Sequence, residues 1–261
     1  MLLSSRKNPA VLKYRRLVRE RAFREECGEF PIEGARLCEE ALRCGLVLTS
    51  FFATETAKEK YEKNFFEISE KIVPCMISTD IAAYISDTKS PQGLFLTAKT
   101  LDKTPESGKI EKDGRYLLLD GVQDPGNIGT MLRTCDAFGF SGVILSPDCA
   151  DLYSPKTVRS AMGSLFRLPA IRAELPEMIE RLKRLGYRVY AATPNENAVP
   201  VTSLSLGKNT AVIIGNEGNG ISEEVYRAAE QRLYIPIENA ESLNASAAAA
   251  VLCWEMCRRD R

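Results

Sequence analysis

The second half of the chain alternates short apolar runs with amphipathic segments of helical spacing. Strands that alternate with helices form mostly parallel sheets whose two faces are both covered. This half therefore predicts an α/β domain built on a parallel sheet. The predicted strands are 116–119, 143–145, 187–192, 210–214 and 233–235, and the predicted helices are 128–138, 156–162, 177–185, 222–230 and a last helix that starts after Asn244.

The first half predicts a smaller α/β unit. A polar stretch at 103–114, with Pro and Gly, is typical of a linker. The expected division is therefore an N-terminal domain at 1–102, a linker at 103–114 and a C-terminal domain at 115–261. In the small domain, the predicted helices are 33–44 and 80–85, and the predicted strands are 46–48, 51–52, 72–73 and 93–96.

Composition excludes several classes of protein. A content of 44% hydrophobic and 27% charged residues is that of a soluble globular chain. No apolar run reaches the length of a membrane-spanning helix, and residues 1–7 lack the apolar core of a signal peptide, so a cytoplasmic protein without a membrane partner is expected. Eight Cys occur without a CxxC pair, and there is no His. We expect reduced thiols, no metal and no His-based catalysis.

The first 24 residues are strongly basic, with Glu20 as their single acid. Such an arm on a chain of zero net charge suits contact with nucleic acid phosphates, and Arg15, Arg16 and Arg19 are the candidate contacts. The alternative is a solvated helix whose apolar side carries Tyr14, Leu17 and Val18. Both interpretations stay open at the level of the sequence.

Three polar loops follow predicted strands of the second half. In parallel sheets ligands bind beyond the carboxyl ends of strands. In the loop 120–129 Asn127 is a predicted helix N-cap, and in the loop 235–246 Ser242 and Asn244 are predicted N-caps of the last helix. No GxGxxG follows the first strand and no GxxxxGK[ST] occurs, which disfavours dinucleotide-binding and P-loop enzymes. The loops are 120–129 with Arg133 downstream, 214–221 with three Gly around Glu217, and 235–246.

Together these loops resemble the SpoU branch of the SPOUT RNA methyltransferases. The matching stretches are DPGNIGTMLRTCDAFG with Asn127 and Arg133, GNEGNG at 215–220, and IP at 235–236 followed by SLN at 242–244. The stretch 154–164, which contains Arg159, is also similar to this family. Upstream, FPIEG at 30–34 and SPQG at 90–93 look like the ribosomal-protein-like substrate-binding domain that often precedes it.

The resemblance implies a SPOUT domain with a trefoil knot, acting as a homodimer. It also implies transfer of a methyl group from S-adenosylmethionine to a ribose 2′-hydroxyl of ribosomal or transfer RNA. Arg159 joins the arginines of the arm as an implied RNA contact. The implied catalytic residues are Asn127, Arg133, Glu217, Ser242 and Asn244, and the implied cofactor-binding residues are Thr193, Gly215, Asn216, Gly218, Ile235, Pro236 and Leu243.

A guanidinium stays protonated and is a poor base, so we expect Arg133 to clamp an RNA phosphate and stabilise the developing oxyanion. Ribosomal RNA is the expected substrate because of the additional N-terminal domain. The alternatives are a transfer RNA methyltransferase, a non-catalytic ribosome-assembly factor, and an enzyme that acts on a small nucleotide. Cys253, Trp254 and Met256 are expected to face a core or a dimer interface.

Overall fold

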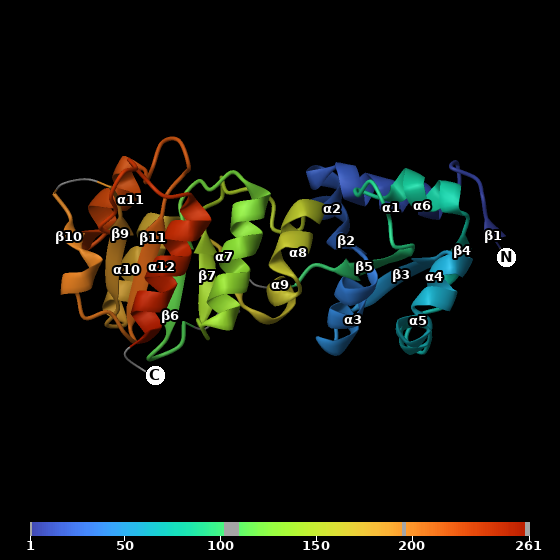
Figure 1. Ribbon diagram of the computed structural model, residues 1–261, viewed down its shortest axis with the longest axis horizontal. Coiled ribbons are helices and arrows are strands. Elements are labelled where there is room, and N and C mark those ends of the chain that lie inside the picture. The colour runs from blue at the N-terminus through green and yellow to red at the C-terminus, as the bar shows by residue number, and fades with distance from the viewer. Residues whose placement is uncertain (1, 102–109, 195–196, 259–261) are drawn as a thin grey trace. The chain divides into compact units, whose positions relative to one another are not determined.

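The computed structural model describes residues 2–101, 110–194 and 197–258. Its chain divides into two units (Figure 1): Met1–Leu101 with Asp151–Phe166, and Asp102–Ala150 with Arg167–Arg261. The expected division assigned 151–166 to the C-terminal domain, whereas the structure packs this segment into the first unit. Most of the expected linker, residues 103–109, lies outside the described residues.

The first unit contains a mixed five-stranded sheet in the order β1-β4-β3-β5-β2. β5 pairs antiparallel with β2 and β3, and β4 pairs parallel with β1 and β3. This arrangement confirms the small α/β unit. The strands are β1 (Leu2–Leu3), β2 (Glu29–Glu33), β3 (Leu48–Ala53), β4 (Cys75–Ile77) and β5 (Leu94–Lys99), and the helices are α1 (Pro9–Arg19), α2 (Arg21–Cys27), α3 (Ala35–Arg43), α4 (Glu55–Lys60), α5 (Glu62–Ser69), α6 (Thr79–Ile85), α8 (Pro155–Ala161) and α9 (Ser164–Arg167).

The predicted strand at 72–73 is wrong. Residues 71–72 form a turn and a bend, and Val73 is 86% exposed. Pro74 has no N–H to donate to a sheet ladder and restricts the backbone of the residue before it. The strand of this region, β4, accordingly starts after the proline, at Cys75.

The basic arm is helical. α1 starts with Pro9 after Asn8, whose side chain accepts a hydrogen bond from the Ala10 amide at 2.9 Å. Tyr14 and Val18 of α1 pack with Phe52, Phe95 and α6 in one hydrophobic core. The apolar side that the sequence suggests for this helix therefore exists, while Lys13, Arg16 and Arg19 are exposed on its surface.

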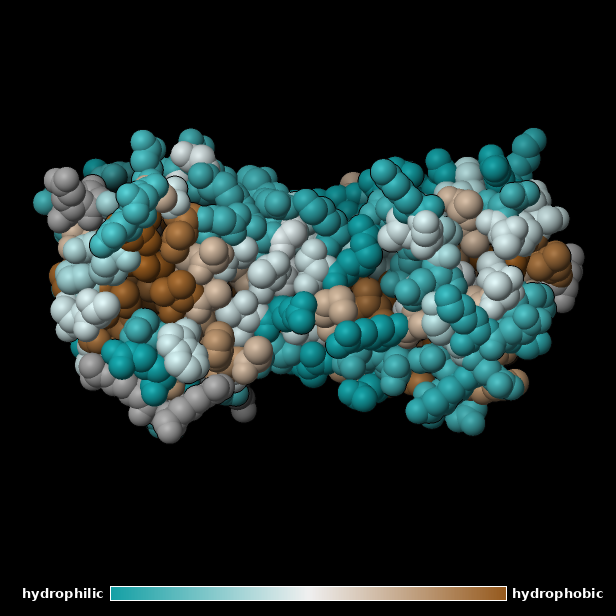
Figure 2. Space-filling view, viewed as in Figure 1, coloured by the Kyte–Doolittle hydropathy of each residue, from teal (hydrophilic) through white to brown (hydrophobic). Residues whose placement is uncertain are grey.

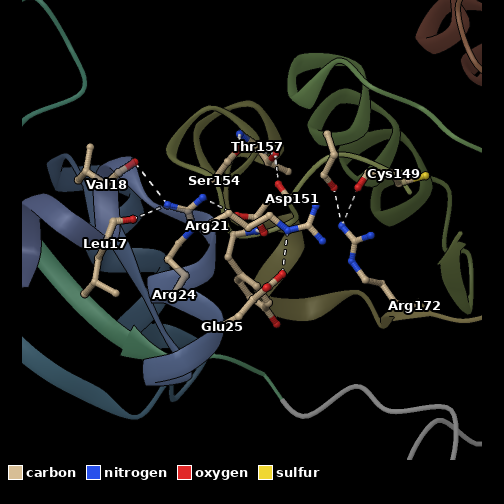
Figure 3. A network of polar contacts seen from close by, with 12 residues as sticks. Leu17, Val18, Arg21, Arg24, Glu25, Cys149, Asp151, Ser154, Thr157 and Arg172 are labelled. Atoms are coloured by element: carbon tan, nitrogen blue, oxygen red, sulfur yellow. Dashed lines mark hydrogen bonds and ion pairs between the residues drawn. The ribbon is translucent and has the colours of Figure 1, made fainter. Parts of the chain in front are cut away.

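Residues 151–166 are held in the first unit by a buried ion pair and by aromatic packing. Arg24, whose side chain is 6% exposed, donates to the Asp151 carboxylate at 2.6 Å and to the Leu17 carbonyl at 2.5 Å (Figure 3). The ring of Phe30 lies 4.8 Å from that of Tyr153, centroid to centroid. The segment thus contributes to the core of this unit.

The second unit contains a seven-stranded sheet in the order β10-β12-β9-β11-β6-β7-β8, in which every pairing is parallel. The predicted α/β fold with a parallel sheet is confirmed, while the trefoil knot stays a prediction. The strands are β6 (Arg115–Leu119), β7 (Gly142–Leu145), β8 (Ala170–Arg172), β9 (Arg188–Ala192), β10 (Val199–Pro200), β11 (Thr210–Ile214) and β12 (Gln231–Tyr234), and the helices are α7 (Pro125–Ala137), α10 (Leu175–Arg184), the 3₁₀ turn η1 (Val201–Ser203), α11 (Glu223–Ala228) and α12 (Ala245–Cys257).

Helices cover both faces of this sheet (Figure 1). Leu118 of β6 and Ile213 of β11 share a core with α10 and α11. Since successive strand side chains point to opposite faces, their neighbours in sequence face the other side, where α7 and α12 pack together. There the thiols of Cys135 and Cys253 lie 3.9 Å apart. All residues of β6 and β11 are buried, which explains the apolar runs 116–119 and 211–214 within them.

Candidate active site

The three polar loops leave the same edge of the second sheet. β6 and β11 pair in the sheet with Leu119 opposite Ile214, and β9 lies between β11 and β12 and pairs with both. Because these strands are parallel, their carboxyl ends lie together, and the loops after Leu119, Ile214 and Tyr234 meet there. The predicted gathering of the three loops is therefore present in the structure.

The glycine loop is a closed turn that requires Gly215. A Cβ atom on this residue would lie 2.3 Å from the backbone carbon of Gly220 and 2.4 Å from the Ile221 nitrogen. Asn216 and Gly220 exchange two backbone hydrogen bonds, and the Asn216 Oδ1 accepts from the Gly218 amide at 2.9 Å. The loop holds Glu217 at its tip.

Two further contacts join this loop to the one after β6. The Asn216 side chain donates to the Gly121 carbonyl at 2.7 Å. Asp120 is buried, and its carboxylate accepts a hydrogen bond from the Ser222 amide at 2.7 Å. Sequence reasoning did not select Asp120 as a functional residue. Its position as a carboxylate directly after the apolar run 116–119 was the available signal.

A relay of side-chain amides connects the three loops. Asn127 donates to Glu217 Oε1 at 2.8 Å, and Asn244 donates to the Asn127 Oδ1 at 3.3 Å. The Oδ1 of Asn244 in turn accepts from the Ser246 amide at 2.9 Å. Each of the three loops thus supplies one predicted catalytic residue to a single network.

The N-cap assignments are partly confirmed. Asn244 caps α12, as predicted. Asn127 is not the N-cap of α7, because Asp124 takes that place and accepts from the Gly126 amide at 2.7 Å, with Pro125 in the first turn. The Asn127 side chain is consequently available for Glu217. Ser242 caps no helix and is exposed beside the pocket.

Hydrogen bonds control the charge of Glu217. Partial burial raises the pKa of its carboxyl. Hydrogen bonds from the Asn127 side chain and from the Gln123 and Asp124 amides have the larger, opposite effect, so the pKa lies below the ordinary value of 4.5. Glu217 is therefore a carboxylate at neutral pH. With its lone pairs engaged, it is a better anchor for the loops than a general base.

We expect Glu217→Gln to remove part of the acid sensitivity of the fold. Because the pKa of the folded carboxyl is lowered, its contribution to stability is present above the pKa of the unfolded chain and is lost as the pH falls through the folded value. Urea unfolding midpoints of wild type and variant should differ at neutral pH and converge in acid. Glu223→Gln, which removes an exposed carboxylate paired with Arg227 at 2.9 Å, is the control. A difference that stays constant from neutral to acidic pH would contradict the expectation.

A pocket of about 460 Å³ opens beside this network. Its size is that of small-molecule and cofactor sites, which run from about 300 to 1,000 Å³. Of the predicted cofactor-binding residues, Pro236 alone is not part of its wall. The lining includes Thr193, Gly215, Asn216, Glu217, Gly218, Ile235, Ser242, Leu243 and Asn244, and also Pro194, Tyr234, Ile237, Ala245 and Ala248, which sequence reasoning did not select.

Arg133 lies apart from the pocket wall. It is exposed on α7, two turns after Asn127, and does not line the cavity. Among the described residues, no hydrogen bond or ion pair restrains its guanidinium. The side chain is thus available to an external ligand.

The four basic residues selected from the sequence are differently restrained. Arg15 lies over the Tyr84 ring, 3.8 Å from its centroid, and donates to the Tyr84 carbonyl at 2.6 Å. Arg16 pairs with Glu20 at 3.0 Å, and Arg159 pairs with Asp87 at 2.7 Å. Arg19 is exposed. All four belong to the first unit.

The described residues contain no helix long and apolar enough to cross a membrane. They also contain no cluster of three or more side chains suited to binding a metal ion.

Known protein families match both parts of this chain. Residues 114–254 match the model of the SpoU rRNA Methylase family, and residues 8–96 match the MRM3-like substrate binding domain. Over 256 residues, 97% of this chain and 98% of the relative, the sequence is 35% identical to the 23S rRNA (guanosine(2553)-2′-O)-methyltransferase RlmP of Bacillus subtilis. The chain belongs to the SpoU rRNA methylase family. This finding confirms the resemblance drawn from the three loops.

Solved structures of SpoU methyltransferases have the same fold over their full length. An AdoMet-bound rRNA methyltransferase from Sinorhizobium meliloti superposes with a TM-score of 0.88 at 27% identity, covering 99% of this chain and 98% of the other. The SpoU methyltransferase AviRb from Streptomyces viridochromogenes, in complex with AdoMet, gives 0.86 at 26% identity and covers 97% and 98%. The two-unit architecture is thus shared with other SpoU family members.

Proposed function

We propose that this protein transfers a methyl group from S-adenosylmethionine to a ribose 2′-hydroxyl of ribosomal RNA. The observation that carries the proposal is the Asn127–Glu217–Asn244 network at the rim of the pocket, in a chain of the SpoU family. RlmP of Bacillus subtilis is named as a 23S rRNA 2′-O-methyltransferase, as is a Streptomyces viridochromogenes relative that is 28% identical over 97% of this chain.

The pocket residues fit S-adenosylmethionine. Ile235, Leu243 and Ala248 offer an apolar surface to an adenine ring, and the closed turn at Gly215 brings backbone groups to the pocket wall without an intervening side chain. The cofactor supplies a methyl group on a positively charged sulfonium. The two AdoMet-bound neighbours support this choice of ligand.

In the proposed reaction, the residues of this chain position the ribose and stabilise charge. Arg133 clamps a phosphate of the RNA and stabilises the oxyanion that forms as the 2′-hydroxyl loses its proton. Asn127, Glu217 and Asn244 fix the geometry of the loops, and Ser242 adds a hydroxyl at the pocket wall. Arg15, Arg16, Arg19 and Arg159 are the proposed RNA contacts of the first unit.

The test is transfer of labelled methyl from S-adenosylmethionine to unmodified ribosomal and transfer RNA, with nuclease mapping of the product. Label at a cleavage-resistant linkage in ribosomal RNA is the expected result. Label in transfer RNA alone would establish the alternative substrate, and cofactor binding without label in either RNA would favour a non-catalytic assembly factor. Salt-sensitive RNA affinity separates all of these from an enzyme that acts on a small nucleotide.

We further propose a homodimer formed through the face that contains α12. Hydrophobic residues gather over α12 in Figure 2. Trp254 is 46% exposed, and Val251 and Leu243 are also exposed, whereas Cys253 and Met256 are buried against the unit's own core. The apolar area of this face and the small Ala residues of α12 suit close packing with a second copy.

A cytoplasmic location stays a prediction.

Trp254→Glu is expected to raise the dissociation constant of this dimer at least about 30-fold, because a buried interface tryptophan typically contributes 2 kcal/mol or more. Sedimentation equilibrium across the micromolar range measures the constant. Val73→Glu, at an 86% exposed apolar residue of the first unit, is the control and should leave it unchanged. Monomeric wild-type protein at micromolar concentration would contradict the dimer.

A further inference from the structure

Asp120 is a buried carboxylate that the proposed reaction does not use. It directly follows the apolar run 116–119 of β6 and is 6% exposed. Among the residues that the structure describes, its carboxylate accepts a hydrogen bond from one backbone amide and pairs with no cation. Burying a charge is costly unless hydrogen bonds compensate for the lost water. The groups that bind this carboxylate therefore indicate its role.

Asp120 connects the two ends of the glycine loop, residues 214–221. Where the loop begins, the Asp120 amide donates to the Ile214 carbonyl at 2.9 Å. Where the loop ends, the Asp120 carboxylate accepts from the amide of Ser222, the first residue after the loop, at 2.7 Å. Hydrogen bonds to an ionised acceptor are stronger than those between neutral groups. One residue after β6 thus fixes both ends of the glycine loop.

The chain between these two ends forms one wall of the pocket. Residues 217–220 are exposed, so packing contributes little to their order. The backbone at Gly215 lies against the backbone of Gly220 and Ile221, so a shift at the end of the loop would also displace its beginning. The loop residues that line the pocket are Ile214, Gly215, Asn216, Glu217, Gly218 and Gly220.

The two halves of the loop are attached at different points. Asn216 and Glu217 attach the first half to the loop after β6, through their side chains. For the second half, residues 218–221, the described hydrogen bond to that loop is the one between Ser222 and Asp120. Asp120 is not part of the pocket wall. It can therefore act on a bound ligand only through the glycine loop.

We infer that Asp120 is a positioning residue, which holds the end of the glycine loop in the conformation that completes the cofactor pocket. The inference deepens the proposed function and rests on it. Without the bond to Ser222, the complete pocket wall forms in only a fraction of the molecules, and the apparent affinity for S-adenosylmethionine falls by that fraction. Once the cofactor is bound the wall is complete, so the rate constant of methyl transfer at saturating cofactor keeps its wild-type value.

Asp120→Ala and Ser222→Pro remove the two sides of this hydrogen bond. Proline lacks the amide donor, and the Ser222 φ of −62° is one that proline adopts. Each change should raise the dissociation constant of S-adenosylmethionine, measured by isothermal titration calorimetry on the full-length chain, at least about 10-fold. The double variant should show no more than the larger single effect, because both changes remove the same contact.

Two conservative variants are the matched controls. Asp120→Asn keeps an oxygen that can accept from the Ser222 amide, so its cofactor affinity should stay within about 3-fold of wild type. Ser222→Ala keeps the amide and removes a hydroxyl that caps no helix, so it should match wild type. Single-turnover rate constants at saturating cofactor should equal the wild-type value in every variant, and circular dichroism verifies that each protein is folded.

The outcomes separate this inference from the proposed function. Wild-type cofactor affinity in folded Asp120→Ala or Ser222→Pro would overturn the positioning role while the function stands. Additive effects in the double variant, or equal losses of affinity in Asp120→Asn and Asp120→Ala, would also overturn it, because the hydrogen bond would not be the cause. If Asp120→Ala does not fold, the comparison of Ser222→Pro with Ser222→Ala decides. If wild type binds no S-adenosylmethionine, the inference and the proposed function fail together.

Discussion

Arg133→Ala is expected to lower the rate constant of methyl transfer about 100- to 1,000-fold, the usual cost of removing one donor that stabilises a developing oxyanion. The affinity for S-adenosylmethionine should stay at the wild-type value, because Arg133 does not line the pocket. Thermal stability should also be unchanged, since no contact within the described residues depends on its guanidinium. Single-turnover kinetics with saturating cofactor measures the rate constant.

Two further variants make this expectation specific. Arg133→Lys keeps the charge but loses the planar pair of donors, so its rate should lie between those of alanine and wild type. Nearly full activity in Arg133→Lys would contradict a bidentate phosphate clamp. Arg227→Ala removes an exposed arginine of α11 that pairs with Glu223, and as a control it should retain the wild-type rate.

Arg24→Met is expected to destabilise the first unit by about 3 kcal/mol, because it leaves the Asp151 carboxylate, which is only 15% exposed, without its charged partner. Far-UV circular dichroism during urea unfolding reports the helices of both units, whereas fluorescence of the single tryptophan, Trp254, reports the second unit. The dichroism transition should shift to lower urea. Arg21→Met, whose pair with Glu25 is largely exposed, should cost about 0.5 kcal/mol or less.

A double variant separates the ion pair from packing. Asp151→Asn combined with Arg24→Met should be less destabilising than the sum of the single changes, since the second substitution removes the charge that the first leaves unpaired. Additive effects would show that the pair contributes little, and that loss of the Arg24 side-chain packing explains the instability.

The sequence predicted five strands of the second unit because each contains an apolar run, but it did not predict β8 and β10, which are only three and two residues long. The motif residues Asn127, Glu217 and Asn244 could be selected together, since three strand-end loops in fixed order are a specific signal. Their connections were harder to anticipate. Asn127 looked like an N-cap, and only the geometry of Asp124 and Pro125 shows why its side chain is available to Glu217.

Long-range packing limited the predictions for the first unit. Nothing local in residues 151–166 distinguishes a segment that packs on its own domain from one that packs on β2. Arg24 and Asp151 are 127 residues apart in the chain, so their pairing has no signature in the sequence. The roles of Arg15 and Arg16 were equally hidden, because stacking on Tyr84 and on Phe23 depends on how α1 and its neighbours fold.

The placement of residues 151–166 has a consequence for how proteins of this design can be recombined. The segment lies inside the stretch that matches the methylase family, yet it completes the core of the unit that matches the substrate-binding family. A chimera joined near residue 101 would therefore combine the N-terminal segment of one protein with the α8 segment of another. The residue equivalent to Arg24 and the residue equivalent to Asp151 would then come from different proteins. A chimera that keeps the core of the first unit intact therefore requires both of its segments, the N-terminal one and 151–166, from the same protein.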